Sequence, residues 1–574
     1  MDFKSFMTSV EQTLSRFHDI SELKEWIQNY ARSLPEEARE DFLKQLQETE
    51  QRSHKEKLDE IIAWCKKLEN EEIVLSCYSH EEYDPEYWTW DPDWVTEYED
   101  PAGIGPQLKK YYAEAEQAVY DRDYDSASLM YWNLGTLTVT AEDETGMDPV
   151  ELGIEEMVSE SLVSLDLKKI ASLTLYSTYQ AYELPERVPK LYGFFSWRMF
   201  QDIGIEDMLS AGRETLQGVE DFLDAWISYL REQDDSYTSR LLIEAITYRG
   251  GDEDLLEEAK REPNHYPKLY IRMLERLFEK KNWDRLQKEG MEALSRMKRK
   301  IEMRDRAARL AAAGAARCRD AAKEMEALCE AFCSKPTAAN YFRVITSPGA
   351  GKETENEKTA RMLQTAEELQ AALQAGEKPQ EYGLWNRHER KETDSYRQTD
   401  TDRMGICFLS GDYREILREC RKTKDHLGWS GRFINAGVPM LLLFLYEEDD
   451  IEKFGKAMRS IVSDIQGFIG YQAEFGEADF EERFLRWREL VKIPAEEKKK
   501  ILKYVTETID QRVEAIVGGS HRKSYWKAAK LGAALGEVEE SQGKMNGKYL
   551  RIQGYLKQFP RHRAFKEEMR AYNM

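Results

Sequence analysis

The motif that comes nearest to phosphate chemistry is a glycine-rich run ending in lysine, TSPGAGKE at residues 346–353. A phosphate-binding loop needs GxxxxGK[ST] after a strand, so that backbone N–H groups surround the phosphate and the hydroxyl binds Mg²⁺. Here Thr346 stands in place of the first glycine, and a strand over residues 341–345 would have to precede it. Glu353 replaces the hydroxyl residue and would repel phosphate. We therefore interpret the run as a loop between helices.

Three residues with metal-binding side chains, Cys65, Cys77 and His80, lie close together in the sequence. Structural zinc sites use four ligands, usually in close pairs such as CxxC, and no fourth ligand lies nearby. Cys65 falls on an apolar helical face, and unbonded cysteine is among the most buried residue types. We therefore expect core cysteines, and neither a metal nor another cofactor. Cys329 and Cys333, one helical turn apart, are interpreted as packing residues.

The sequence contains no local catalytic motif. Its eight histidines are scattered, and neither HExxH nor GxSxG is present. We therefore predict no catalytic residue. Because catalytic triads assemble from distant parts of a chain, an enzyme with an unrecognised helical active site stays an open alternative.

Residues 71–106 combine acidity with aromatic side chains. The longer stretch 71–160 contains 24 acidic residues against three basic ones, a local charge of −21. The four prolines of the segment exclude a continuous helix. Trp88, Trp90 and Trp94 are the candidates for partner binding. They belong either to a strap packed along a helical surface, since three tryptophans are costly to leave in water, or to an acidic aromatic ligand for a basic partner.

The C-terminal tail has the opposite charge. From His521 onward there are 12 Lys and Arg residues against five Asp and Glu residues, a local charge of +7. The candidates for contacts with a nucleic-acid backbone are Arg522, Lys523, Arg561, His562 and Arg563. The alternative is a solvated helix face that pairs with acidic segments elsewhere in the fold.

The composition narrows the class of protein. The 574 residues include 83 Lys and Arg against 108 Asp and Glu, a net charge of −25, which disfavours non-specific wrapping of duplex DNA. Hydrophobic residues make up 41%, enough for a large core. Seven cysteines, a sparse and odd number, indicate reduced thiols and a cytoplasmic protein. No signal peptide is recognised, and the most apolar stretch, 436–446, is about half of the ~20 residues that cross a bilayer, so we expect a buried core helix and no membrane contact.

Apolar residues at three- and four-residue spacing predict that most of the chain is helical. Residues 111–131 and 267–297 each resemble one tetratricopeptide (TPR) hairpin, in which small residues let two helices pack closely. Tyr124 and Trp283 mark their turns, and Tyr413 marks a third trace. These turn residues are 159 and 130 positions apart, neither a multiple of the ~34-residue TPR period. The sequence therefore predicts an all-α fold, an irregular TPR-like helical-hairpin solenoid.

The pattern divides the chain into five segments. They are an N-terminal helical hairpin or bundle at 1–70, the acidic non-helical segment at 71–106, TPR-like helical repeats at 107–333, a loop-rich linker with one helix at 334–403, and a C-terminal helical domain with the basic tail at 404–574. Within the third segment, 296–333 is predicted to form one long helix, because small and apolar residues recur along a single face.

The C-terminal half resembles a known family. The runs that carry the resemblance are LGWS at 427–430, HRKSYWKAA at 521–529, LGEV at 535–538 and FPRHRAF at 559–565. They are similar to the helical C-terminal region of bacterial proteins of the SWIM zinc-finger family. The resemblance implies a TPR-like helical region. Proteins of that family carry a CxC…CxH zinc motif, and this sequence contains no CxC.

These observations favour a non-catalytic helical-repeat scaffold that binds a protein or peptide partner, because superhelical stacks present long concave surfaces. The alternative is a nucleic-acid-associated accessory factor that acts through the basic C-terminal tail. The second alternative is the enzyme with an unrecognised helical active site.

Overall fold

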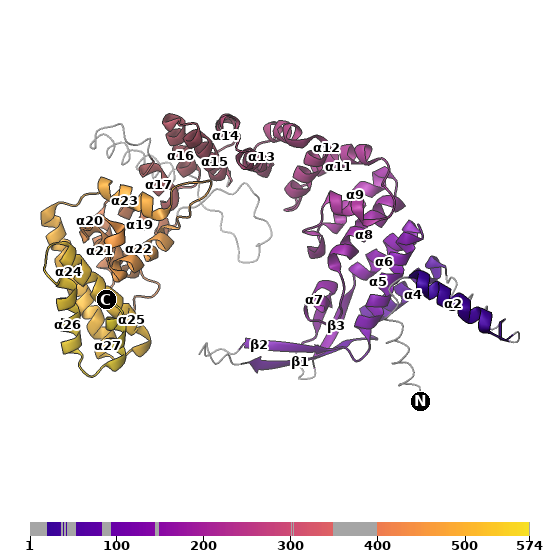
Figure 1. The fold of residues 1–574 in the computed structure, drawn as a ribbon, viewed down its shortest axis with the longest axis horizontal. Coiled ribbons are helices and arrows are strands. Elements are labelled where there is room, and N and C mark those ends of the chain that lie inside the picture. Colours follow the sequence, from indigo (N-terminus) through magenta and orange to yellow (C-terminus); the bar gives the residue numbers. More distant parts are fainter. Residues whose placement is uncertain are drawn as a thin grey trace. The chain divides into compact units, whose positions relative to one another are not determined.

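The computed structural model of the protein describes residues 20–35, 38, 39, 42, 53–82, 93–143, 148–299, 301, 303–347 and 399–572. The described residues are mostly helical (Figure 1). The chain divides into two units, Met1–Arg249 and Gly250–Met574.

The first unit contains a four-stranded sheet, so the prediction of an all-α fold is wrong. The strands are β1 (Leu75–Glu82), β2 (Asp93–Glu99), β3 (Thr138–Asp143) and β4 (Val150–Gly153), in the order β2-β1-β3-β4. The pairs β1–β2 and β3–β4 are antiparallel. β1 and β3 are parallel, and they pair only from Leu75 to Cys77 on β1.

Local sequence explains why these strands form. β3 reads TVTAED, which begins with three β-branched residues, and the buried Val139 and Ala141 alternate with more exposed neighbours. Pro85 and Pro92, which were expected to prevent a helix, lie outside the described residues; they also lie outside the bounds of β1 and β2 and therefore remove no hydrogen bond from this ladder. Strands this short were hidden by the strong helical periodicity on either side of them.

Helices make up most of the remainder of the first unit. They are α2 (Ile20–Ser33), α4 (His54–Glu69), α5 (Ile104–Tyr120), α6 (Tyr124–Gly135), α7 (Ile154–Ser159), α8 (Leu167–Ala181), α9 (Leu184–Phe194), α10 (Ile205–Ala211) and α11 (Val219–Leu230), with the 3₁₀ turn η1 (Arg198–Phe200). α5 begins before the expected boundary at residue 107, because the Asp100 carboxylate accepts the N–H groups of Ile104 and Gly105 at 2.7 and 2.8 Å. α4, α5 and α8 pack against α6.

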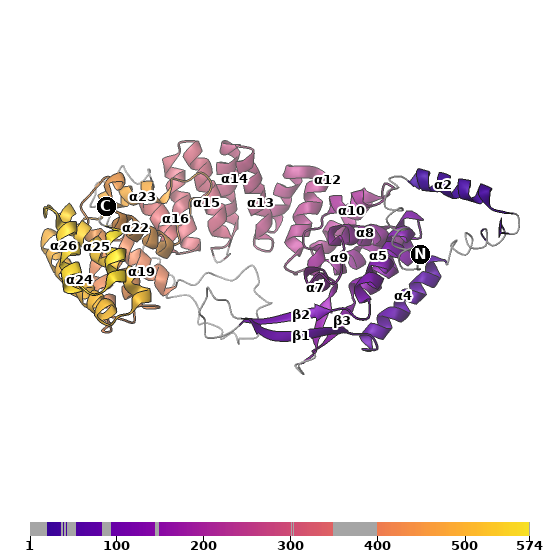
Figure 2. The ribbon, with the colours of Figure 1, turned by 60° about the horizontal axis from the view of Figure 1, so that its bottom comes forward.

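The described residues of the second unit form helices joined by turns and loops, with no strand among them. Its helices are α13 (Pro267–Glu279), α14 (Trp283–Arg296), α15 (Arg304–Arg317), α16 (Ala321–Ser334), α17 (Ala338–Ile345), α19 (Asp400–Leu409), α20 (Tyr413–Cys420), α21 (Ile434–Leu445), α22 (Lys456–Ile469), α23 (Phe480–Leu490), α24 (Ala495–Val513), α25 (Tyr525–Ser541), α26 (Gly547–Gln558) and α27 (Arg563–Arg570), with the short turns η3 (Ile451–Lys453), η4 (Glu514–Gly518) and η5 (Arg522–Ser524). α12 (Thr238–Arg261) contains the boundary between the units and is interrupted at Gly251, whose φ is 78°. Helices α13 to α16 lie side by side (Figure 2).

Four helical hairpins share one turn geometry. The second residue after each first helix has a positive φ, at Arg122 (67°), Lys281 (56°), Arg319 (59°) and Gly411 (80°). In each turn the next residue, Asp or Asn, donates its N–H to the carbonyl five residues earlier at 2.9 Å, which satisfies the end of the first helix. The helical hairpins expected at 111–131 and 267–297 and around Tyr413 are present as α5–α6, α13–α14 and α19–α20.

The single long helix predicted for residues 296–333 is wrong, because the segment contains both α15 and α16. Arg319 adopts the left-handed conformation between them, and the Asp320 carboxylate accepts the N–H of Lys323 at 3.1 Å as the N-cap of α16. The small-residue face does allow close packing. A Cβ on Gly290 of α14 would lie 2.6 Å from the Cβ of Ala311 on α15.

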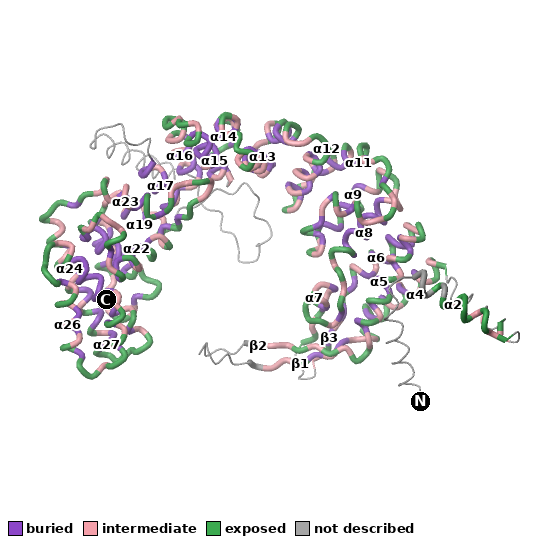
Figure 3. The backbone as a smooth tube through the Cα atoms, viewed as in Figure 1, coloured by how far each residue is buried: buried purple, intermediate pink, exposed green. Residues whose placement is uncertain are grey.

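The apolar stretch expected as a core helix is α21, which is buried in the second unit (Figure 3). It packs against α20, α22, α24 and α25. Met440, Leu441 and Leu442 have exposed fractions of 0%, and their burial contributes to the apolar stabilisation of this core. None of the helices that the structure describes combines the length and the hydropathy needed to cross a membrane.

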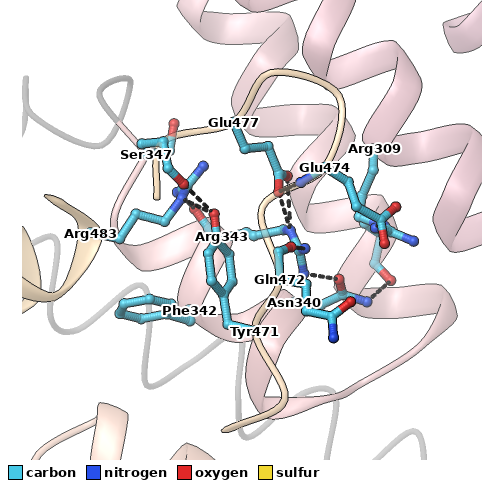
Figure 4. A network of polar contacts seen from close by, with 12 residues as sticks. Arg309, Asn340, Phe342, Arg343, Ser347, Tyr471, Gln472, Glu474, Glu477 and Arg483 are labelled. Atoms are coloured by element: carbon cyan, nitrogen blue, oxygen red, sulfur yellow. Dashed lines mark hydrogen bonds and ion pairs between the residues drawn. The ribbon is translucent and has the colours of Figure 1, made fainter. Parts of the chain in front are cut away.

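A network of buried polar side chains joins α17 and α23 to the loop that precedes α23 (Figure 4). Arg343 on α17 is 4% exposed, and its Nε lies 2.8 and 3.0 Å from the carboxylate oxygens of Glu477. Arg483 on α23 is 5% exposed and donates to the hydroxyls of Tyr471 and Thr346 at 2.8 and 2.9 Å. Both guanidinium groups lie near the ring of Tyr471, at 4.7 and 5.6 Å from its centroid. The loop is therefore fastened to two helices at once.

Candidate functional site

The structure does not bring together the three residues considered as metal ligands. Cys65 on α4 and Cys77 on β1 are both buried, and each Sγ lies 3.8 Å from a backbone carbonyl oxygen. His80 is three residues beyond Cys77 and therefore points to the opposite face of β1, where its ring stacks on Tyr78. Among the residues that the structure describes, no cluster of three or more His, Cys, Asp or Glu is placed to hold a metal ion.

The glycine-rich run at 346–353 follows a helix. Residues 341–345 belong to α17, and Thr346 ends that helix by donating its N–H to the Phe342 carbonyl at 3.2 Å. The Thr346 hydroxyl is held by Arg483 in the buried network. Residues 348–353 lie outside the described residues. The strand that a phosphate-binding loop requires before its first glycine is replaced by a helix.

The three tryptophans proposed for partner binding are only partly within the described chain. Trp88 and Trp90 lie outside the described residues. Trp94 lies in β2 opposite Glu81, and its side chain is likewise outside the described part. The structure does describe the strands that flank this segment, β1 and β2.

β1 and β2 form an acidic hairpin. The four strands of the sheet contain eight Asp and Glu residues and no Lys or Arg. Tyr78 is 50% exposed, faces Glu97 across the ladder, and stacks on His80 with the ring centroids 5.5 Å apart. Glu97 and Glu99 are exposed, and neither forms an ion pair with another described residue. This face therefore presents an aromatic ring beside carboxylates whose charge is not neutralised.

The opposite face anchors the hairpin in the first unit. The Ser79 hydroxyl lies 3.1 Å from the Thr96 hydroxyl and donates to the Asp143 carboxylate at 2.7 Å. Burial raises the pKa of the Tyr98 phenol, and the nearby Cys77 and Glu160 raise it further. Since polar and aromatic groups on this face contact the rest of the unit, the face with Tyr78 is the more exposed of the two.

The structure brings the two halves of the predicted nucleic-acid site together at the C-terminal end of the second unit. Arg522 and Lys523 form η5, which leads directly into Tyr525 of α25. The ring of His562 has its centroid 6.2 Å from that of Tyr525 and 5.7 Å from that of Phe559. The four Arg and Lys side chains of the prediction are exposed, whereas His562 is half-buried.

Ion pairing neutralises only part of this cationic surface. Arg563 lies 3.2 Å from Glu567. Arg522, Lys523 and Arg561 form no ion pair with a residue in the described ranges. Three of the five predicted residues are therefore cations open to an anionic partner.

One exposed aromatic side chain near this surface was missed by sequence analysis. Trp526 is 46% exposed, and the Nζ atoms of Lys527 and Lys530 lie 5.5 and 5.4 Å from its ring centroid. The signal was the four-residue spacing, which places Lys530 beside the tryptophan on a helix; Lys530 also pairs with Asp464 at 2.6 Å. Exposed aromatic rings flanked by cations can stack on nucleic-acid bases.

Sequence analysis also did not single out Tyr78, Glu97 and Glu99. The strands read LSCYSHEE and DWVTEYE, in which alternate residues share a face. That alternation was the available signal. It has meaning only once the segment is assigned to strands, because in a helix the same residues would point in several directions.

Comparison with protein-family models, with curated proteins and with solved structures finds no match to this chain. The resemblance of the C-terminal half to SWIM zinc-finger family proteins stays a prediction.

Proposed function

We propose that this protein is a non-catalytic helical-hairpin scaffold, an irregular TPR-like solenoid, that binds a protein or peptide partner. The observation that carries the proposal is the recurrence of one turn geometry in four helical hairpins, at Arg122, Lys281, Arg319 and Gly411. Stacked hairpins bury their apolar faces against one another and leave extended surfaces for a partner.

Packing within the second unit supports the proposal. α14 packs against both α13 and α15, α15 packs against α16, and α16 packs against α17. Glycines permit the close approach: a Cβ on Gly314 of α15 would lie 2.7 Å from the backbone nitrogen of Gln287 on α14. Each helix is thus stabilised by its neighbours in sequence, as in helical-repeat proteins.

A nucleic-acid-associated accessory factor is the second candidate function. The observation that favours it is the cationic surface around η5 and His562, where Arg522, Lys523 and Arg561 are exposed and form no ion pair with a described residue. Neutralisation of backbone phosphates by such cations supplies most non-specific affinity for nucleic acid.

Affinity capture with the full chain, with and without nuclease, tests the two functions against each other. For a scaffold we expect a bound protein that survives nuclease treatment and survives the Arg561→Glu/Arg563→Glu substitution. The matched control is Lys499→Glu/Lys500→Glu, which reverses two exposed charges on α24. Circular dichroism of both variants verifies that the helical fold is retained.

The opposite results would overturn the scaffold in favour of nucleic-acid binding. They are loss of all captured material after nuclease, loss with Arg561→Glu/Arg563→Glu but not with the control, and an affinity that falls steeply with salt.

A further inference from the structure

We infer that the outer edge of β2 accepts an extended, basic segment of a partner protein as a fifth strand of the sheet. This inference rests on the proposed function, because it names the site and the chemistry by which the scaffold would bind its partner.

The first step is the open edge of β2. β2 is the terminal strand in the order β2-β1-β3-β4 and, among the residues that the structure describes, pairs with β1 alone. Because β3 pairs with β1 only as far as Cys77, the hairpin continues past β3 (Figures 1 and 2). An edge strand of seven residues presents a row of unpaired N–H and C=O groups. Edges of this kind bind extended peptides through main-chain hydrogen bonds.

The second step is the charge of the sheet, which selects the occupant. Its strands carry acidic residues and no Lys or Arg, and Asp93, Glu97 and Glu99 all lie on β2 itself. Pairing of two copies of this edge would place like charges side by side, which destabilises a ladder. A strand with Lys or Arg side chains meets the complementary charge. The occupant is therefore a basic segment and not a second copy of this chain.

The third step is the spacing of the side chains. Glu97 and Glu99 point to the same face of β2, about 7 Å apart along the strand. Tyr78 lies directly opposite Glu97 on β1 and is half exposed, so its ring can receive a cation that also contacts the carboxylate. A partner strand with Lys or Arg at alternate positions places two cations beside Glu97 and Glu99. The predicted recognition element is thus an extended [KR]-x-[KR] segment.

The test measures binding of a labelled heptapeptide, TKTKTKT, to the full chain at low salt by fluorescence anisotropy. The variant is Glu97→Lys/Glu99→Lys. The control, Glu186→Lys/Glu232→Lys, changes the net charge of the same unit equally at two exposed carboxylates. A second peptide with the same side chains and methyl groups on all its backbone nitrogens keeps the charge but cannot donate hydrogen bonds to an edge. A third peptide, TETETET, reverses the charge.

The wild type and the control variant should bind TKTKTKT with the same affinity. Glu97→Lys/Glu99→Lys should bind it about tenfold more weakly, the loss expected for two exposed ion pairs, and should prefer TETETET. The methylated peptide should bind the wild type at least about tenfold more weakly than TKTKTKT, because the ladder hydrogen bonds cannot form. Hydrogen exchange at residues 93–99 should slow when TKTKTKT is bound.

Equal binding of the methylated and unmodified peptides, absence of binding by the wild type, or unchanged binding by Glu97→Lys/Glu99→Lys would each overturn the inference. If Glu97→Lys/Glu99→Lys self-associates in sedimentation while the wild type binds no peptide, the role of Glu97 and Glu99 is only to prevent the β2 edges of two copies from pairing. Partner capture separates this failure from failure of the proposed function. If the wild type and Glu97→Lys/Glu99→Lys capture the same protein equally well, the scaffold stands and strand addition is wrong; if neither captures a protein, the scaffold proposal itself is wrong.

Discussion

The ion pair between Arg343 and Glu477 should couple α17 to the loop before α23 more strongly than any exposed pair in the second unit. The side chains are 5% and 10% exposed, and the guanidinium also donates to the Gln472 carbonyl at 2.7 Å and to Asn340 at 3.3 Å. Glu477→Gln keeps the shape of the side chain but leaves the Arg343 charge buried without a counter-charge. Arg343→Met removes the cation and leaves the Glu477 carboxylate.

The structure sets the size of each effect. Breaking a buried pair by removing one partner costs about 3–5 kcal/mol, because the remaining charge is neither solvated nor paired. The double variant Arg343→Met/Glu477→Gln buries no unpaired charge. It loses the hydrogen bonds of Arg343 to Glu477, Gln472 and Asn340 and the contact of its guanidinium with the Tyr471 ring, so we expect a cost of about 1–3 kcal/mol. The two substitutions should therefore be coupled by at least about 2 kcal/mol.

Hydrogen exchange measured by mass spectrometry reports this cost locally. Peptides that cover α17 and residues 471–490 should exchange about two orders of magnitude faster in each single variant, while peptides from α25 serve as the internal control. The double variant should recover most of the lost protection. The reasoning would be refuted if Glu477→Gln kept the protection of the wild type, or if the double variant were destabilised by the sum of the two single effects.

Three further predictions concern turns, titration and thiols. In urea denaturation, Arg319→Gly should raise the free energy of unfolding by about 0.5–1 kcal/mol, because glycine adopts a φ of 59° without strain. Gly411→Ala should lower the free energy of unfolding, since φ at this position is 80° and the alanine Cβ would lie 2.8 Å from Val491. Equal effects of the two substitutions would contradict the shared turn geometry. The hydrogen bond from Lys280 lowers the pKa of Asp252 in the folded protein. The ionised carboxylate therefore stabilises the fold fully above the unfolded pKa of about 4, and this stabilisation is lost as the pH falls through the lower folded pKa. Urea titrations should show that Asp252→Asn is less stable than the wild type at neutral pH and that the difference shrinks below about pH 4. Burial raises the pKa of the Cys420 thiol to about 12. At pH 8, iodoacetamide should therefore label Cys420 at least about tenfold more slowly in the native chain than in the unfolded chain. Equal labelling rates would show that the thiol is accessible in the native chain.

Local pattern was sufficient for the helices and their turns. The TPR-like pattern of small and apolar residues placed α13 and α14, and an uninterrupted apolar run placed α21, because one turn of a helix is defined by neighbours in sequence. The turn at Tyr124 was found in the same way. The turn at Arg319 carries the same Arg-Asp pair as Arg122-Asp123, but the continuous apolar face on both sides of it favoured one long helix.

The sheet was not predicted, since a strand is stabilised by partners distant in sequence. β1 and β3 are separated by the hairpin partner β2 and by two helices, and only their pairing shows that Tyr78 and Glu97 share a face. The same reason applies at the C-terminal surface, where His562 meets Tyr525, 37 positions earlier in the sequence.

The sequence by itself determined that this protein is mostly helical, that its net charge is divided between an acidic early segment and a basic tail, and that 436–446 is a core helix. These properties depend on composition and on contacts within one helical turn. Only the tertiary structure decided that the acidic segment contributes an open sheet edge and that Arg343 and Arg483 are buried. Burial of a charge and pairing of a strand both depend on groups that the chain brings together only when it folds.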